Sequence, residues 1–217
     1  RSPSRGLGDV YKRQIRNSQG TTVKLLEAVF APRETRHFIL NDGGILPDQY
    51  GLVSIAGSEI LCQTMVYRYG SSGLNYAYSI PLTDGLSDEV WSSYNILNPN
   101  PRGVIGFNWL TVVNLDQQVQ SYLLEEYNSQ GVLVRQRSLG SIPMFARVDV
   151  SLGSEVSPTG VYRVIPQNSS SKYLSYSVRY FASAEKLVAF PNFAVAEDCR
   201  DFNLSVSTML AADNWLE

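Results

Sequence analysis

The segment "NWLTVVNLDQQVQSYLLEEYNSQGVLVRQRSL" (residues 108–139) decides the fold class. Large apolar residues alternate with short polar ones in 108–115, 118–127 and 132–139, and this alternation is typical of strands that are buried on one face. Asn and Gly in the turn at 128–131 supply the positive φ angles that a tight hairpin needs. The segment therefore predicts three neighbouring strands, of which the last two form an antiparallel hairpin.

The turn of this hairpin also occurs earlier in the chain. "NSQG" stands at 17–20 and again at 128–131, an offset of 111 residues. At the same offset, "VYRYG" (66–70) corresponds to "SVRYF" (177–181). Matches at a fixed spacing and in the same order indicate an internal repeat.

Two further matches support the same period. "YGLVSI" (50–55) matches "TGVYRVI" (159–165) after a slip of two residues, as a change in loop length would produce. "FNWLT" returns as "DNWLE" at the last residues of the chain, each preceded by a similar segment, "SSYNIL" (92–97) and "RDFNLS" (200–205). We therefore predict a truncated first repeat in 15–106, a complete second repeat in 107–213 and the start of a third in 214–217.

The opening stretch, "RSPSRGLGDVYKRQ", stands where the first repeat should begin. It is basic and lacks any apolar periodicity. Residues 9–14, "DVYKRQ", resemble the translated end of a transposase adapter used in sequencing libraries. This resemblance implies that 1–14 are an artefact fused to an environmental gene fragment, so we expect them to lie outside the fold. A natural basic arm is the alternative.

The complete repeat contains seven or eight short strand-like segments with turn signals every 8–12 residues. This pattern predicts an all-β fold of tandem antiparallel immunoglobulin-like β-sandwich domains, without the cysteine spacing of antibody domains. The segment 108–150 resembles tandem Ig-like repeats of bacterial secreted and surface proteins related to cell adhesion. The resemblance implies an extracellular or cell-surface location and a non-catalytic role as a spacer or binding module.

Composition and charge disfavour several classes of function. The net charge is −2, and it becomes −5 when the four cations and one anion of 1–14 are left out, so we expect no nucleic-acid partner. No apolar run approaches the ~20 residues that span a bilayer. The two cysteines, Cys62 and Cys199, lack the spacing of a zinc site, and a single bridge between them remains an alternative to two free thiols.

Catalytic and metal sites find little support in the sequence. His37 is the only histidine, and we interpret it as a strand residue rather than as part of a catalytic triad. Asp84, Asp88 and Glu89 form an oxygen-rich loop that either is a solvated turn or binds Ca²⁺, although its spacing is not that of an EF-hand. We therefore expect no enzyme and no cofactor, with calcium as the alternative.

Aromatic residues provide the candidate binding site. Four of them lie close together in the sequence of the first repeat: Trp91, Tyr94, Tyr76 and Tyr78. Exposed aromatic rows stack on sugar rings, but Tyr and Trp are also ordinary strand and core residues. The sequence thus leaves open a carbohydrate-binding module of a larger extracellular enzyme as the alternative function.

The predicted function is that of a structural or adhesive repeat fragment. Its expected partners are other repeats of the same chain and a surface protein or polysaccharide. A repeat that lacks strands exposes unpaired sheet edges, which pair with other chains. We therefore expect the first repeat to promote self-association.

Overall fold

The computed structural model is all-β and is described for 9–31, 33–40, 49–56, 62–71, 73–81, 83–97, 106–182, 187–193 and 195–196. No described residue is helical, so no described helix is long and apolar enough to cross a membrane. The strands are β1 (Asp9–Asn17), β2 (Thr22–Phe30), β3 (Gly51–Ala56), β4 (Gln63–Gly70), β5 (Gly73–Pro81), β6 (Val90–Asn95), β7 (Phe107–Asn114), β8 (Gln120–Asn128), β9 (Leu133–Ile142), β10 (Arg147–Leu152), β11 (Thr159–Pro166), β12 (Tyr173–Ala182), β13 (Leu187–Phe193) and β14 (Val195–Ala196).

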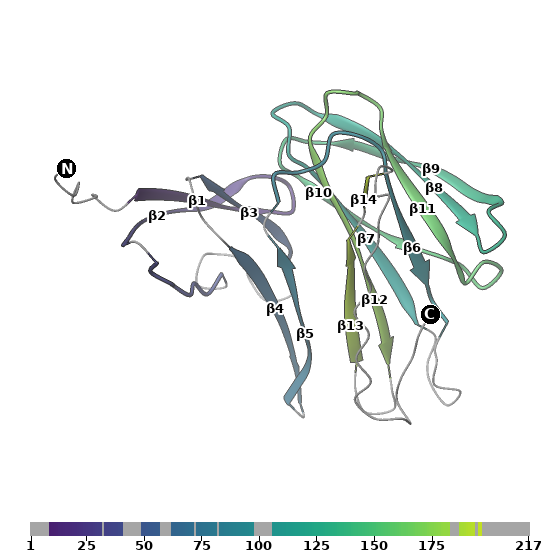
Figure 1. The fold of residues 1–217 in the computed structure, drawn as a ribbon, viewed down its shortest axis with the longest axis horizontal. Helices are drawn as coiled ribbons and strands as arrows, with labels where there is room; N and C mark the ends of the chain where they lie inside the picture. The colour runs from purple at the N-terminus through teal and green to yellow at the C-terminus, as the bar shows by residue number, and fades with distance from the viewer. Residues whose placement is uncertain are drawn as a thin grey trace, which may run out of the picture.

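Strands β6–β14 form two antiparallel sheets that pack face to face, and we call this part the two-layer unit (Figure 1). One sheet has the order β10-β7-β12-β13 and the other has the order β14-β6-β11-β8-β9. One core cluster draws side chains from both sheets. The prediction of an all-β fold with antiparallel sheets is therefore confirmed.

The alternation read from the sequence produces this core. On β8, the side chains of Tyr122 and Leu124 are fully buried, and Leu123 between them is only half-buried on the opposite face. Successive side chains of a strand point to opposite faces, so one face of β8 enters the core and the other stays near solvent. The hairpin predicted at 128–131 is the β8–β9 turn, where Gly131 has φ = 74°.

The first five strands form two smaller sheets, one with the order β2-β1-β3 and one made of β4 and β5. Residues 9–14, expected to lie outside the fold, form most of β1, which pairs with both β2 and β3. The neighbouring Ile15 is 1% exposed. Pairing on both edges and burial of one face give this basic stretch the same support as any central strand.

The first five strands pack directly against the two-layer unit, with β5 alongside β13 (Figure 1). The Arg147 amide donates a hydrogen bond to the Ser18 carbonyl over 2.9 Å. Gly20 (φ = 82°) approaches so closely that a Cβ there would lie 2.2 Å from the Met144 carbonyl oxygen, so only glycine fits this position. The turn of the β1–β2 hairpin thus packs against the segment that joins β9 to β10 in the two-layer unit.

The pairing of β1, β2 and β3 has the same register as that of β8, β9 and β11. Ile15 lies opposite Lys24 in the first hairpin, and Glu126 lies opposite Arg135 in the second, each 111 residues further on. Asn17 lies opposite Gly51, and Asn128 lies opposite Gly160, so the third strand recurs at an offset of 109. The difference of two residues equals the slip seen in the sequence.

The two hairpin turns also share their hydrogen bonds. The Asn17 side-chain oxygen accepts from the amides of Gln19 and Thr21, at 3.1 and 3.0 Å. The Asn128 oxygen accepts from the amides of Gln130 and Val132, at 3.0 and 2.9 Å. Asn side chains stabilise turns in this way by satisfying backbone donors that face no strand partner.

The two-layer unit includes one strand that the sequence boundaries assign elsewhere. β6 lies within 15–106, yet it pairs with β11, and Tyr94 lies opposite Gly160. The boundary between 106 and 107 therefore falls inside the two-layer unit. The remaining part of the predicted second repeat beyond Ala196, and the start of the third, lie outside the described residues.

Candidate functional site

Two adjacent carboxylates on β8, Glu125 and Glu126, organise the polar groups of the five-stranded sheet. They point to opposite faces because neighbouring strand residues alternate. Glu126 faces the core side and is 1% exposed, whereas Glu125 faces the outer side and is 6% exposed. Each carboxylate is paired with arginine, as a buried charge requires.

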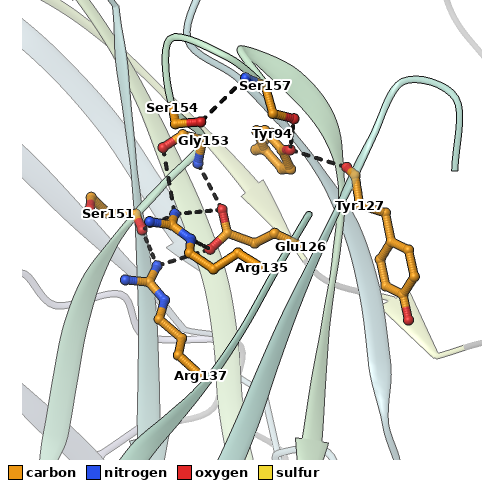
Figure 2. Close-up of polar contacts among 9 residues, drawn as sticks. All are labelled: Tyr94, Glu126, Tyr127, Arg135, Arg137, Ser151, Gly153, Ser154 and Ser157. Atoms are coloured by element: carbon orange, nitrogen blue, oxygen red, sulfur yellow. Dashed lines mark hydrogen bonds and ion pairs between the residues drawn. The ribbon is translucent and has the colours of Figure 1, made fainter. Parts of the chain in front are cut away.

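Glu126 lies at one end of the core, where two arginines of β9 converge on it (Figure 2). Its two oxygens accept from Nε and Nη2 of Arg135, both over 2.7 Å, and Arg137 donates over 3.1 Å. The Gly153 amide donates to the same carboxylate over 2.9 Å. The Arg–carboxylate fork and the backbone donor together compensate for burying the negative charge.

The same arginines also bind the end of β10 and the residue that follows it. Arg137 donates to the Ser151 carbonyl oxygen, and Arg135 lies 3.5 Å from the carbonyl oxygens of Ser151 and Gly153 (Figure 2). Burial lowers the pKa of the Arg137 guanidinium, and the neighbouring Arg135 lowers it further. The arrangement joins β8 and β9 of one sheet to β10 of the other and closes this end of the core. It is a structural cluster.

The outer face carries a second group of residues, which we call the outer platform: Trp91 on β6, Arg163 on β11, and Glu125 and Tyr127 on β8. The Arg163 guanidinium lies 4.9 Å from the centre of the Trp91 ring, within the range of a cation–π contact. The Trp91 and Tyr127 rings are 5.5 Å apart. Arg163 donates to Glu125 over 2.7 Å, so the aromatic and charged groups form one continuous surface.

The protonation of the outer platform follows from these contacts. The pKa of the Glu125 carboxyl is lowered, first because Tyr127 donates its hydroxyl over 2.7 Å and then because Gln136 and Arg163 donate to it. The same hydrogen bond raises the pKa of the Tyr127 hydroxyl. At neutral pH the platform therefore holds a charged Glu125 carboxylate and a neutral Tyr127 phenol. Both groups are already hydrogen-bonded to neighbouring residues of the platform.

We expect acid to destabilise the protein in part through Glu125. A carboxyl whose pKa is lowered on folding stabilises the folded state above its unfolded pKa, about 4.3, and this contribution disappears as the pH falls through the folded pKa. Urea unfolding should show a free energy of unfolding that falls less steeply between about pH 5 and pH 3 in Glu125→Gln than in the unmodified chain. Equal slopes would contradict the assigned hydrogen bonds.

The predicted aromatic residues do not share one surface. Trp91 lies half-buried on the outer platform, and its indole nitrogen has no hydrogen-bond partner among the described residues. Tyr94 is 2% exposed, and its hydroxyl donates to the Tyr127 carbonyl oxygen over 3.1 Å (Figure 2). Its ring is part of the core, where a sugar has no access. Tyr94 therefore has to be removed from the candidate set.

The other two predicted aromatic residues are on β5, remote in the fold from β6. Tyr78 packs, with Ile80, against Tyr176 and Val178 of β12, so it joins the first five strands to the two-layer unit. The side chain of Tyr76 is outside the described residues. The structure thus brings Trp91 together with Tyr127, a residue that the sequence did not single out.

Two of the three predicted calcium ligands, Asp88 and Glu89, contact different partners instead of facing one common site. Glu89 forms an ion pair with Arg163 over 3.3 Å, and Asp88 accepts from Ser87 over 3.4 Å. Asp84 lies in the same exposed loop. Across the part of the chain that the structure describes, no three side chains of His, Cys, Asp or Glu gather as a metal site. Calcium binding stays a sequence-based hypothesis.

The two remaining sequence candidates have simple environments. His37 is exposed in an irregular segment rather than in a strand. Cys62 is a free thiol, and Cys199 lies outside the described residues.

The polar residues of the site carried a weak sequence signal. The pair Glu125-Glu126 within an apolar strand, opposite the Arg135-Gln136-Arg137 stretch of the next strand, indicates cross-strand ion pairing once the hairpin register is known. Arg163, however, comes from β11, whose position beside β8 cannot be deduced from the hairpin.

Comparisons with known proteins found no match: no family model, no curated protein and no solved structure is significantly similar to this chain.

Proposed function

We propose that the chain is part of a tandem array of Ig-like β-sandwich repeats with a non-catalytic, structural and adhesive role at a bacterial cell surface. The observation that carries this proposal is the common pairing register of β1-β2-β3 and β8-β9-β11. A repeated register requires the same apolar pattern and the same turn chemistry in both parts of the chain. Such duplication is expected of an array that spaces or displays other domains.

The contact between the two parts supports a spacing role. Arg16 stacks on Phe145 at 4.0 Å, and Arg147 stacks on Tyr50 at 4.7 Å. The Arg147 guanidinium is also held by Asp149 over 2.6 Å. The cation–π and backbone contacts across this boundary favour a stiff connection, which a spacer needs in order to hold what it carries away from the surface. The proposed role requires no cofactor.

A carbohydrate-binding module is the second candidate, and the outer platform favours it. Trp91 and Tyr127 present neighbouring rings, and Arg163, Glu125 and Gln136 add hydrogen-bonding groups at their edge. Sugar sites combine aromatic surface with a few convergent polar groups. The polar groups here are mutually paired, so a sugar would have to displace existing hydrogen bonds.

A glycan array probed with the unmodified chain and with Trp91→Ala separates the two functions. The structural role predicts that no glycan retains the unmodified chain above the level of Trp91→Ala. Specific retention of the unmodified chain that is lost in Trp91→Ala would overturn the proposal in favour of the sugar-binding module. Tyr50→Ala, which changes an aromatic residue away from the outer platform, is the matched control and should behave as the unmodified chain.

A further inference from the structure

The outer edge of β3 differs from that of its counterpart β11. β11 lies between two partners, with β8 on one side and β6 on the other. β3 pairs with β1, and among the described residues nothing pairs with its other edge. A sheet edge with free backbone donors and acceptors is a template for another strand.

The strand that fills the equivalent edge shows what β3 can accept. β6 is antiparallel to β11, with Tyr94 opposite Gly160 and Trp91 opposite Arg163. A Cβ at Gly160 would lie 1.9 Å from the Tyr127 carbonyl oxygen of β8 and 2.9 Å from the Tyr94 hydroxyl of β6, so the glycine makes room for both neighbouring strands. Gly51 occupies the same register position on β3. The acceptor edge therefore has a glycine at the position that would face the donor's aromatic ring.

A second segment of the chain has the sequence of such a donor. "RDFNLS" (200–205) matches "SSYNIL" (92–97), with Phe202 in the place of Tyr94 and Asn203 in the place of Asn95. This segment lies outside the described residues. Aromatic and apolar residues at Phe202 and Leu204 alternate with polar ones, as the core-facing and outward positions of β6 do.

We infer that the segment 198–203 of one copy of this chain adds as an antiparallel strand to the outer edge of β3 in a second copy, in the register by which β6 adds to β11. This inference rests on the repeat architecture proposed above. Addition of a strand supplies partners to the β3 edge that has none among the described residues, and the aromatic residue facing Gly51 supplies specificity. The contact is head-to-tail, so it extends into linear oligomers rather than closing as a symmetric dimer.

The β6–β11 register predicts which residues meet. Arg163 lies opposite Trp91, so their counterparts, Ser54 of one copy and Cys199 of the other, should lie directly opposite each other. Directly opposed residues have Cα atoms about 4.5–5.5 Å apart, within the range of a disulfide. In a chain that carries Ser54→Cys and Cys62→Ser, the predicted register therefore allows a disulfide between the cysteine at position 54 of one copy and Cys199 of the other. Gln14 pairs with Ser54 on the next strand, roughly 5 Å further from the added strand, so Gln14→Cys is the matched control.

Mild oxidation followed by non-reducing electrophoresis tests the register. Ser54→Cys should give a ladder of dimers and higher oligomers at least tenfold more abundant than Gln14→Cys, and Cys199→Ser should abolish it. A disulfide-linked dimer that persists in Cys199→Ser, which retains only the engineered cysteine, would mean β3-to-β3 pairing and would overturn the inference. A linked monomer, or equal linkage in both variants, would overturn it as well.

Sedimentation of the chain without engineered cysteines gives a second, independent measurement. Proline removes a ladder hydrogen bond and is excluded from central strands, so Asn203→Pro should shift concentration-dependent oligomers to monomer. A monomer in the unmodified chain at all concentrations would overturn the inference and leave the proposed structural role standing, because that role is tested by the glycan array. Specific sugar retention together with a Cys199-dependent ladder would instead overturn the role and retain the strand addition.

Discussion

Glu126→Ala should lower the free energy of unfolding by about 3 kcal/mol, because it leaves two arginines without their buried counter-charge. The carboxylate also accepts from the Gly153 amide, which would lose its partner. The effect lies at the lower end of the range for buried pairs, since the side chains of Arg135 and Arg137 are 37% and 27% exposed and can be partly hydrated. Urea unfolding followed by the fluorescence of Trp91 and Trp109 in the two-layer unit measures this change.

The first five strands supply a matched variant for this prediction. The residues at the positions of Glu126, Arg135 and Arg137 are Ile15, Lys24 and Leu26. Introducing Glu126→Ile, Arg135→Lys and Arg137→Leu together removes the buried carboxylate and one arginine and leaves a single cation at position 135, where the side chain is 37% exposed. This variant should lower the free energy of unfolding by less than about 1 kcal/mol. If the triple variant is as unstable as Glu126→Ala, the cluster does more than compensate for a buried charge.

Leu124→Ala should lower the free energy of unfolding by about 2–5 kcal/mol, because it leaves a cavity between the two sheets. Leu124 is 0% exposed and belongs to the core cluster shared by both sheets. Leu123→Ala, one residue earlier on the outer face of β8, should cost less than half as much under the same urea unfolding conditions. Equal losses for the two variants would contradict the assigned direction of the β8 side chains.

The local features of the fold could be predicted from the sequence because they depend on neighbouring residues. Alternation of Tyr122 and Leu124 with smaller or polar residues is sufficient to predict a strand with one buried face. The Asn and Gly of "NSQG" are sufficient to predict the turn, and the Asn side chain accepts equivalent hydrogen bonds from the following backbone in both copies.

The partners of each strand were decided by the tertiary structure. β6 pairs with β11, about seventy residues further along the chain, and no local pattern identifies this pairing. It turns Tyr94 into the core and leaves Trp91 beside Arg163 on the outer platform, so it separates two residues that the sequence placed in one site. Residues 9–14 likewise become a strand through their pairing with β2 and β3.

The sequence by itself determined the all-β character, the hairpin turns and the faces of the strands, because these follow from the period of two and from backbone preferences within a few residues. Only the tertiary structure decided which strands are neighbours and which charged groups meet. That choice depends on the free energy of burying whole sheet faces together, to which residues far apart in the sequence contribute at once.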